Sequence, residues 1–325
     1  MRLFCRCSLP TSLVLAACSA TTLAAQQPAA PAPAPAPSSG VKFSGYIQAR
    51  ETYQDEAGLT GSINRARLTA SGGIATNFTW RISGEFRTGN AGKGASVALA
   101  DGYIRWKKKD FGIQAGQFKT PFAREYYTAL PDVETADRAT VVDSLAPKRD
   151  IGVMADYDLR GKAMLQAGVF NGEGQNVTTN KDSTVLGVAR LVVRPLKDIN
   201  VGGSVAMYFG DSTRYGVEAN YEGPELTVRG EYVAQARDSL GGDTDKGWYG
   251  LAAYFVHKKV QLVAKYEDFS RDAISLQQQN QAWTGGANLF LAGTAVRLTL
   301  EYISREVGDP GVRKGTGLAQ LQLRF

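Results

Sequence analysis

The stretch that decides the fold is residues 78–87, FTWRISGEFR, in which apolar and polar side chains alternate. Phe78, Trp80, Ile82 and Phe86 share one parity, and threonine, arginine, serine and glutamate occupy positions of the other. Successive side chains of a β-strand point to opposite faces, so this segment has an apolar face and a charged face. The core of a soluble sandwich would not accept such charges, whereas a barrel wall between lipid and water would.

The same alternation recurs to the C-terminus in segments of roughly ten residues, which is the length that a tilted strand needs to cross a bilayer. Residues 225–236 and 294–304 repeat it clearly. The pattern predicts sixteen strands, at 41–52, 63–75, 78–88, 97–107, 111–119, 150–159, 162–171, 184–194, 199–209, 214–222, 225–236, 247–257, 260–269, 282–291, 294–304 and 315–325.

The connections between these segments alternate between tight turns, such as residues 159–161 and 222–224, and longer polar stretches, such as 172–183 and 237–246. An up-and-down barrel with short turns at one end and loops at the other has this arrangement. We therefore expect an all-β fold, a transmembrane antiparallel β-barrel of about sixteen strands over residues 41–325. A barrel of that size encloses a lumen too wide for side chains to fill, so the lumen should hold water.

The last segment, residues 318–325, alternates and ends in Phe325. This resembles the terminal signature of bacterial outer-membrane barrels, and the resemblance implies the bacterial outer membrane as the location. Membrane lipid and lipopolysaccharide are then the expected surroundings of the barrel.

The N-terminal 25 residues have the composition of a secretory signal peptide, with Arg2 and Arg6 before an apolar run and small residues after it. Cleavage near residue 25 is expected, although Cys18 also fits a lipoprotein cleavage box. Residues 26–40, QQPAAPAPAPAPSSG, alternate proline and alanine and predict an extended periplasmic linker. All three cysteines precede residue 19, so no disulfide is expected within the barrel.

The charge and the residue types exclude several classes of function. The formal charge of +6 includes Arg2 and Arg6, and the remaining excess is too scattered to indicate nucleic-acid binding. His257 is the one histidine in the chain, and it lies beside two lysines at a tight turn, so we expect neither an enzyme nor a metal site. No cofactor is implied.

The longest connection, residues 120–149, follows the fifth predicted strand, and loops of this length are usually functional. Its apolar residues, among them Phe122, Tyr126 and Val141, favour a loop that folds into the barrel and constricts the lumen over a solvated outer loop. The candidate constriction residues are the bases Arg124 and Arg138 and the acids Glu125, Asp132, Glu134, Asp137 and Asp143.

Three runs in this region, residues 116–122 (GQFKTPF), 141–147 (VVDSLAP) and 149–152 (RDIG), resemble the family of phosphate-selective porins O and P. The resemblance implies a sixteen-stranded barrel, usually a homotrimer, with a basic pore that passes phosphate or related anions. It also implies that lysines near the constriction hold the anion, and Lys119 occupies the matching stretch. However, residues 120–150 contain four bases and six acids, which departs from the expected basic loop.

Parity gives a second estimate of the residues that face the lumen, and it predicts more bases than acids there. Rings of basic side chains favour anions, because low-dielectric walls strengthen the field across a narrow pore. The candidate basic wall consists of Arg65, Arg67, Arg81, Arg87 and Arg105. These arginines are expected either to form an anion path or to pair with nearby acids and hold the loop. We expect a diffusion channel that prefers small anions; a weakly selective general porin, a non-conducting barrel that anchors the envelope and a sugar channel are the alternatives.

Overall fold

The structure is a computed structural model that describes residues 40–325 with short gaps at 56, 88–95, 181–182, 238–243, 274–275 and 307–310. The side chains of 87, 272–273 and 276–280 also lie outside the description. The predicted signal peptide and most of the predicted linker fall in residues 1–39, which are outside the described residues. The unit Ala36–Phe325 contains all the elements described below.

Sixteen strands occur in the described part of the chain. Their bounds are β1 Lys42–Gln54, β2 Gly58–Ala75, β3 Phe78–Arg87, β4 Ser96–Lys108, β5 Phe111–Lys119, β6 Arg149–Asp158, β7 Ala163–Phe170, β8 Leu186–Leu196, β9 Ile199–Tyr208, β10 Ser212–Glu222, β11 Leu226–Arg237, β12 Thr244–His257, β13 Val260–Ala273, β14 Leu276–Thr294, β15 Val296–Glu306 and β16 Arg313–Arg324. The predicted all-β fold and the number of strands are confirmed.

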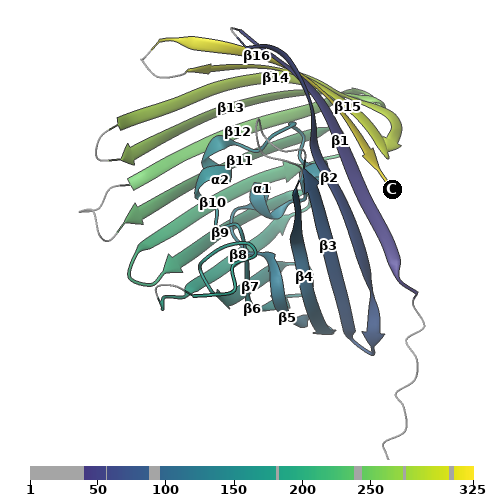
Figure 1. Ribbon diagram of the computed structural model, residues 1–325, viewed down its shortest axis with the longest axis vertical. Coiled ribbons are helices and arrows are strands. Elements are labelled where there is room, and N and C mark those ends of the chain that lie inside the picture. The colour runs from purple at the N-terminus through teal and green to yellow at the C-terminus, as the bar shows by residue number, and fades with distance from the viewer. Residues whose placement is uncertain are drawn as a thin grey trace, which may run out of the picture. The chain divides into compact units, whose positions relative to one another are not determined.

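Every strand pairs antiparallel with its neighbours in sequence, and β1 pairs with β16 to close the barrel (Figure 1). Closure leaves no strand edge, so the backbone of the wall can be satisfied within the bilayer. At the seam, the Gly45 N–H donates to the Phe325 carbonyl (2.9 Å) and the Phe325 N–H donates to the Gly45 carbonyl (3.1 Å). The C-terminal residue is therefore part of the closure.

The two rims of the barrel differ. At one rim each connection has at most four residues, and Asn77 (φ 68°) and Asp198 (φ 65°) supply the left-handed backbone that tight hairpins need. The other rim has the two longest connections, residues 120–148 and 171–185. We call these the short-turn end and the long-loop end. In barrels of this kind the short turns face the periplasm.

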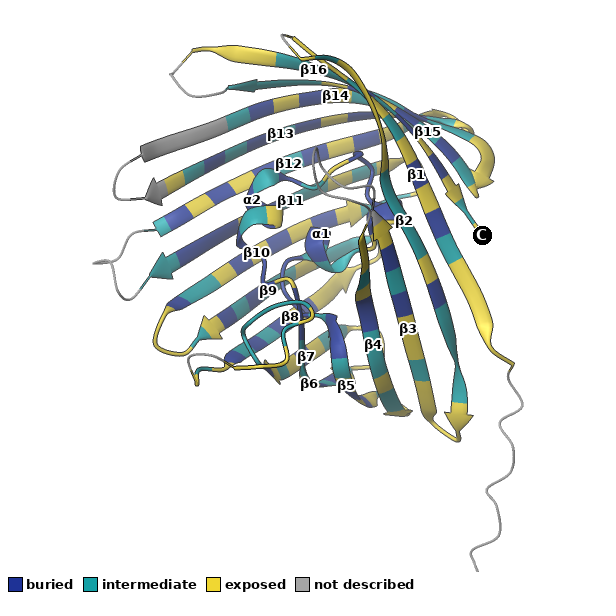
Figure 2. Cartoon of the chain, viewed as in Figure 1, coloured by how far each residue is buried: buried dark blue, intermediate teal, exposed yellow. Residues whose placement is uncertain are grey.

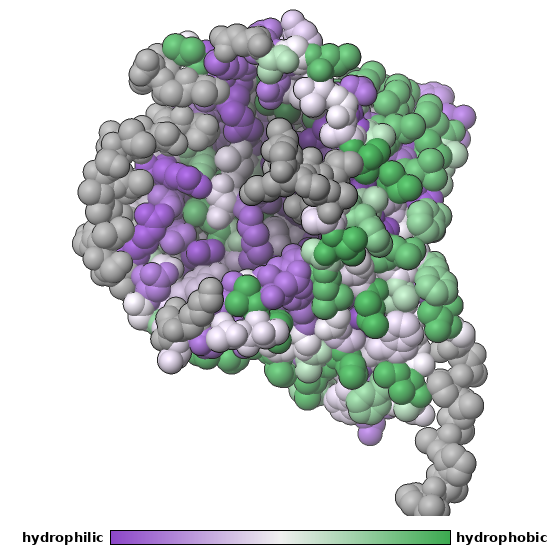
Figure 3. Space-filling view, viewed as in Figure 1, coloured by the Kyte–Doolittle hydropathy of each residue, from purple (hydrophilic) through white to green (hydrophobic). Residues whose placement is uncertain are grey.

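The wall has the predicted alternation of faces. In β3, Phe78, Ile82 and Phe86 are exposed on the outside, whereas Ser83 and Glu85 are buried toward the lumen. Figure 2 shows this alternation as bands along the strands, and Figure 3 shows hydrophilic residues in the hollow of the barrel. No helix among the described residues is long and apolar enough to cross a membrane.

Two strands begin well before the residue that the sequence predicts. β2 begins at Gly58 rather than 63, and β14 begins at Leu276 rather than 282. In β2 the register with β1 shifts between Gln48 and Ala49, so the side-chain alternation is interrupted while the backbone pairing continues. A search for period-two alternation finds alternating side chains, but it does not find backbone pairing that continues past a bulge.

Residues 120–148, which we call the lumenal segment, lie inside the barrel (Figure 1). They contain α1 Arg124–Tyr127, a 3₁₀ turn at Leu130–Asp132 and α2 Thr140–Leu145. Helix α2 contacts β11, β12 and β13. Helix α2 and Phe122 share a hydrophobic core with buried apolar side chains that point inward from the wall, including Val233, Tyr249, Leu251 and Phe269.

Candidate functional site

Buried carboxylates of the barrel wall hold the backbone of the lumenal segment. Three glutamates on alternate strands, β11, β13 and β15, each accept a backbone N–H bond from it. The bonds run from Glu125 N to Glu231 Oε1 (2.7 Å), from Thr140 N to Glu267 Oε2 (2.9 Å) and from Ala136 N to Glu301 Oε1 (2.8 Å). Each bond gives a backbone N–H of the segment an acceptor, and an enclosed N–H without one is costly, so these contacts fix the segment against this side of the wall.

Basic side chains of the wall bind the predicted loop acids. Asp137 pairs with Arg50 of β1 (2.8 Å) and Asp132 pairs with Arg324 of β16 (2.5 Å). Glu134 pairs with Arg229 of β11. These three acids therefore serve as anchors of the segment, and their charges are balanced where they lie.

Glu125 is buried, and its Oε2 accepts the Ala139 N–H of the segment itself (2.9 Å). Burial raises the pKa of the Glu125 carboxyl, against the opposing effects of Lys265, the Ala139 N–H and Arg138. Burial also raises the pKa of Glu134 despite its Arg229 partner. Both carboxyls therefore take up a proton more readily than exposed glutamates do.

Lys119 and Arg138 stabilise the turn around α1. The Lys119 ammonium donates to the carbonyls of Tyr126 (2.7 Å), Tyr127 (3.3 Å) and Thr128 (2.7 Å), which occupies its three N–H donors. Arg138 donates to the carbonyls of Glu125 (2.9 Å) and Thr128 (2.9 Å), and burial lowers the pKa of Arg138. Lys119 thus uses its hydrogen bonds to hold the backbone of the segment.

A cavity with a volume of about 490 Å³ lies between the lumenal segment and the wall, where residues of β1–β3, β5, β6, β9 and β10 line it. We call it the outer cavity, since Lys148 and residues 172–175 at the long-loop end line it. Its described lining contains three acids and seven bases: Glu85, Asp143 and Glu173 against Arg65, Arg67, Lys119, Arg138, Lys148, Arg149 and Arg214. The outer cavity therefore has an excess of positive charge.

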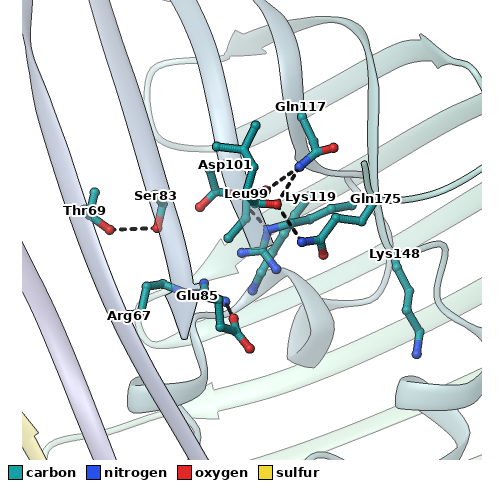
Figure 4. A network of polar contacts seen from close by, with 12 residues as sticks. Arg67, Thr69, Ser83, Glu85, Leu99, Asp101, Gln117, Lys119, Lys148 and Gln175 are labelled. Atoms are coloured by element: carbon teal, nitrogen blue, oxygen red, sulfur yellow. Dashed lines mark hydrogen bonds and ion pairs between the residues drawn. The ribbon is translucent and has the colours of Figure 1, made fainter. Parts of the chain in front are cut away.

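Figure 4 shows the surroundings of three of these bases, Arg67, Lys119 and Lys148. Arg67 and Arg65 both pair with Glu85, and the distance from Arg65 Nη1 to Glu85 Oε1 is 2.8 Å. Arg149 donates to Asp101 Oδ1 (2.7 Å). Lys148 is exposed, and its side chain extends away from the polar network around Gln117. One carboxylate is thus shared between two arginines, which leaves a net positive charge on that side of the cavity.

A second cavity of about 590 Å³, the inner cavity, reaches the short-turn end, where Lys107 and Arg194 line it. Its remaining bases are paired with its acids, as Arg105 with Asp156 (2.8 Å), Arg124 with Glu222 and Arg190 with Glu218 (2.5 Å). A side chain at Gly112 would collide with the Arg105–Asp156 pair, because its Cβ would lie 2.7 Å from Arg105 Nη2. The inner cavity is therefore closer to neutral than the outer one.

The structure brings some of the sequence-predicted basic residues together and separates others. Arg65, Arg67, Lys119 and Arg138 line the outer cavity, and Arg105 and Arg124 line the inner one. Arg81 lies opposite Tyr103 on β4 and is exposed, whereas the side chain of Arg87 lies outside the described residues.

Of the predicted acids, Asp143 is the one that lines the outer cavity. Arg214 and Tyr46 also line this cavity and were missed from the sequence. Both lie on the polar parity of their strands, which is the signal that could have identified them.

Several solved structures of outer-membrane proteins are similar in fold to this chain. The described barrel aligns with the anion-selective porin from Comamonas acidovorans at 13% identity and a TM-score of 0.66, covering 88% of this chain and 100% of that one. It aligns with the trimer form of in-vitro folded Vibrio cholerae OmpT at 12% identity and a TM-score of 0.67, covering 88% and 99%. Salmonella typhi OmpF in complex with daunomycin gives 11% identity, a TM-score of 0.67, and coverage of 88% and 97%. A comparison with curated protein sequences gave no match.

A closed barrel with an apolar outer wall and a charged lumen, similar in fold to these proteins, is an outer-membrane porin. Residues 41–201 match the sequence model of the phosphate-selective porins O and P. This match supports membership of that family, and the family and the fold together indicate a channel protein of the bacterial outer membrane rather than an enzyme.

Proposed function

We propose that this porin is a passive diffusion channel that prefers anions, with phosphate and related small oxyanions as its permeants. The observation that supports the proposal is the excess of bases around the outer cavity, where seven bases face three acids among the described lining residues. Anions entering from the long-loop end would meet this cavity first. The family's printed description and the anion selectivity of the Comamonas acidovorans porin agree with the proposal.

The lumenal segment would act as the constriction. It has more acids than bases, but Asp132, Glu134 and Asp137 are paired with wall arginines. These three acids therefore do not oppose an anion path along β2–β4. We also propose a homotrimer, in line with the trimer form of the Vibrio cholerae neighbour, and export by the N-terminal signal peptide.

A planar-bilayer measurement tests the anion preference. The full chain is reconstituted, the reversal potential is measured across a potassium chloride gradient, and phosphate is then added to look for a reduced chloride current. We expect an anion-directed potential and a phosphate block. A potential that is near zero or cation-directed would leave a general porin and reject the preference.

The substitution Arg81→Glu localises the effect. Arg81 faces the lumen with its side chain exposed, and unit charges 4 Å apart in water interact by about 1 kcal/mol, so reversal should lower the anion-to-cation permeability ratio at least about fivefold. Lys258→Glu, at an exposed short turn, is the matched control and should leave the ratio unchanged. An unchanged ratio in Arg81→Glu would remove this residue from the anion path.

A further inference from the structure

The outer cavity has more room than a small inorganic anion requires. Its volume of about 490 Å³ falls in the range of roughly 300–1,000 Å³ that is usual for sites of organic ligands. One water molecule occupies only about 30 Å³ of liquid volume. An organic group therefore fits in the cavity beside a charged one.

One part of the cavity lining consists of hydrogen-bond donors. Arg65, Arg67 and Arg138 lie there with Tyr46, whose ring lies 5.7 Å from the Arg67 guanidinium carbon. Tyr46 is 8% exposed, and among the described residues its hydroxyl and the Arg67 Nε have no hydrogen-bond partner. Guanidinium and hydroxyl donors around one space suit the oxygens of a phosphate group.

Another part of the lining consists of acceptors. Asp143 and Ser144 of α2 line the outer cavity, and they also line a smaller cavity of about 240 Å³ together with Arg65 and Arg138. Gln175 also lines the outer cavity, and its amide Nε2 donates to the Leu99 carbonyl (2.6 Å), which leaves the amide oxygen as an acceptor (Figure 4). Such groups accept hydrogen bonds from hydroxyls, and the Asp143 carboxylate would repel a second phosphate.

We propose that the outer cavity binds a hydroxylated organic phosphate, the chemical class of sugar phosphates. The phosphate group lies among Arg65, Arg67, Arg138 and Tyr46, and the hydroxyls lie toward Asp143, Ser144 and Gln175. This assignment rests on the anion preference proposed above and adds a requirement for hydroxyl groups that inorganic phosphate cannot meet.

The test compares three probes on the reconstituted full-length protein at pH 8 and constant ionic strength: glucose 6-phosphate, inorganic phosphate and glucose. At this pH both phosphates carry close to two negative charges, because the second pKa is about 6 for a phosphate ester and about 7 for inorganic phosphate. The readout is the concentration that halves the chloride current. One additional hydrogen bond strengthens binding about twofold to twelvefold, so glucose 6-phosphate should block at a severalfold lower concentration than phosphate. Glucose should not block.

Two substitutions separate the two parts of the cavity. Asp143→Ala removes a negative charge and a hydroxyl acceptor, so it should strengthen the phosphate block while abolishing most of the advantage of glucose 6-phosphate. Tyr46→Phe should weaken the block by both phosphates about equally. The controls are Glu225→Ala at an exposed short turn and Tyr221→Phe on the outer wall, and both should leave each of the two blocking concentrations unchanged.

The outcomes distinguish this proposal from the anion preference. If phosphate blocks as well as glucose 6-phosphate, or if Asp143→Ala leaves their ratio unchanged, the organic-phosphate site is wrong while an anion-directed reversal potential still supports the channel's preference. A reversal potential without anion preference would reject both.

Discussion

At the scale of single residues, a basic side chain near the lumen does not always have hydrogen-bond donors left for an anion. Lys119 lies where the family resemblance places an anion-binding lysine, yet its three donors are used by the carbonyls of residues 126–128. Lys148 is exposed on the same cavity. The sequence can indicate that a lysine lies near the lumen. It does not reveal which backbone carbonyls bind that lysine, because they belong to a turn and the alternation of residues does not determine the course of a turn.

Glu125 gives a prediction for the effect of pH. Its pKa is raised in the folded protein, so the native state binds more protons than the unfolded state between the ordinary and the raised value. The docked segment therefore loses stability as pH rises through that window and gains it as pH falls. Glu125→Gln keeps an oxygen acceptor for the Ala139 N–H and removes the charge.

We expect Glu125→Gln to dock more stably than the wild type at pH 7.5 and to change less between pH 7.5 and 4.5. Hydrogen exchange of residues 120–148 at the two pH values measures this. Asp110→Asn, at a short turn, is the control and should keep the wild-type dependence. If exchange in Glu125→Gln follows the wild-type pH profile, Glu125 is not the titrating group.

At the scale of elements, the strands were predictable because each obeys one local rule, the alternation between lipid and lumen. The docking of the lumenal segment was predicted only in outline, from its length and its apolar residues. Its receptor on the wall was missed, although residues 248–256, WYGLAAYFV, are apolar on both parities. That departure from alternation marks the place where Tyr249, Leu251 and Ala253 face α2 instead of water.

The bonds to the three wall glutamates should determine how firmly the segment is held. Glu301→Ala would leave the buried Ala136 N–H without its acceptor, at a cost of about 1–3 kcal/mol, and should loosen the middle of the segment. We expect a larger single-channel conductance with more frequent fluctuations. Glu301→Gln retains an acceptor oxygen and should differ less from the wild type. Equal conductance in all three proteins would show that this bond does not hold the constriction.

At the scale of the whole barrel, closure depends on a close approach between β1 and β16. A Cβ at Gly45 would lie 2.5 Å from the Arg67 carbonyl oxygen and 2.6 Å from the Phe325 ring. The first neighbour is backbone of the adjacent strand β2, which a side chain at Gly45 would have to displace, and the second is the terminal ring at the β1–β16 seam. The terminal Phe325, noted in the sequence as a resemblance to other outer-membrane barrels, therefore also has a steric role in the fold.

We expect Gly45→Val to lower the yield of closed barrel. The heat-modifiable shift in electrophoretic mobility, which separates folded from unfolded barrels, measures the folded fraction after refolding into detergent. Gly285→Val is the matched control, since a Cβ there meets no atom within 4 Å. A folded fraction in Gly45→Val equal to that of the control would show that the seam tolerates a side chain.

The residues that anchor the lumenal segment and the residues that give the outer cavity its charge lie largely on different strands. The anchoring glutamates belong to β11, β13 and β15, whereas Arg65 and Arg67 belong to β2. Mutation can therefore change the solute preference without releasing the segment, and the segment can be retained through many changes of preference. Such a division lets one scaffold diversify its permeants over evolution at little risk to its own assembly.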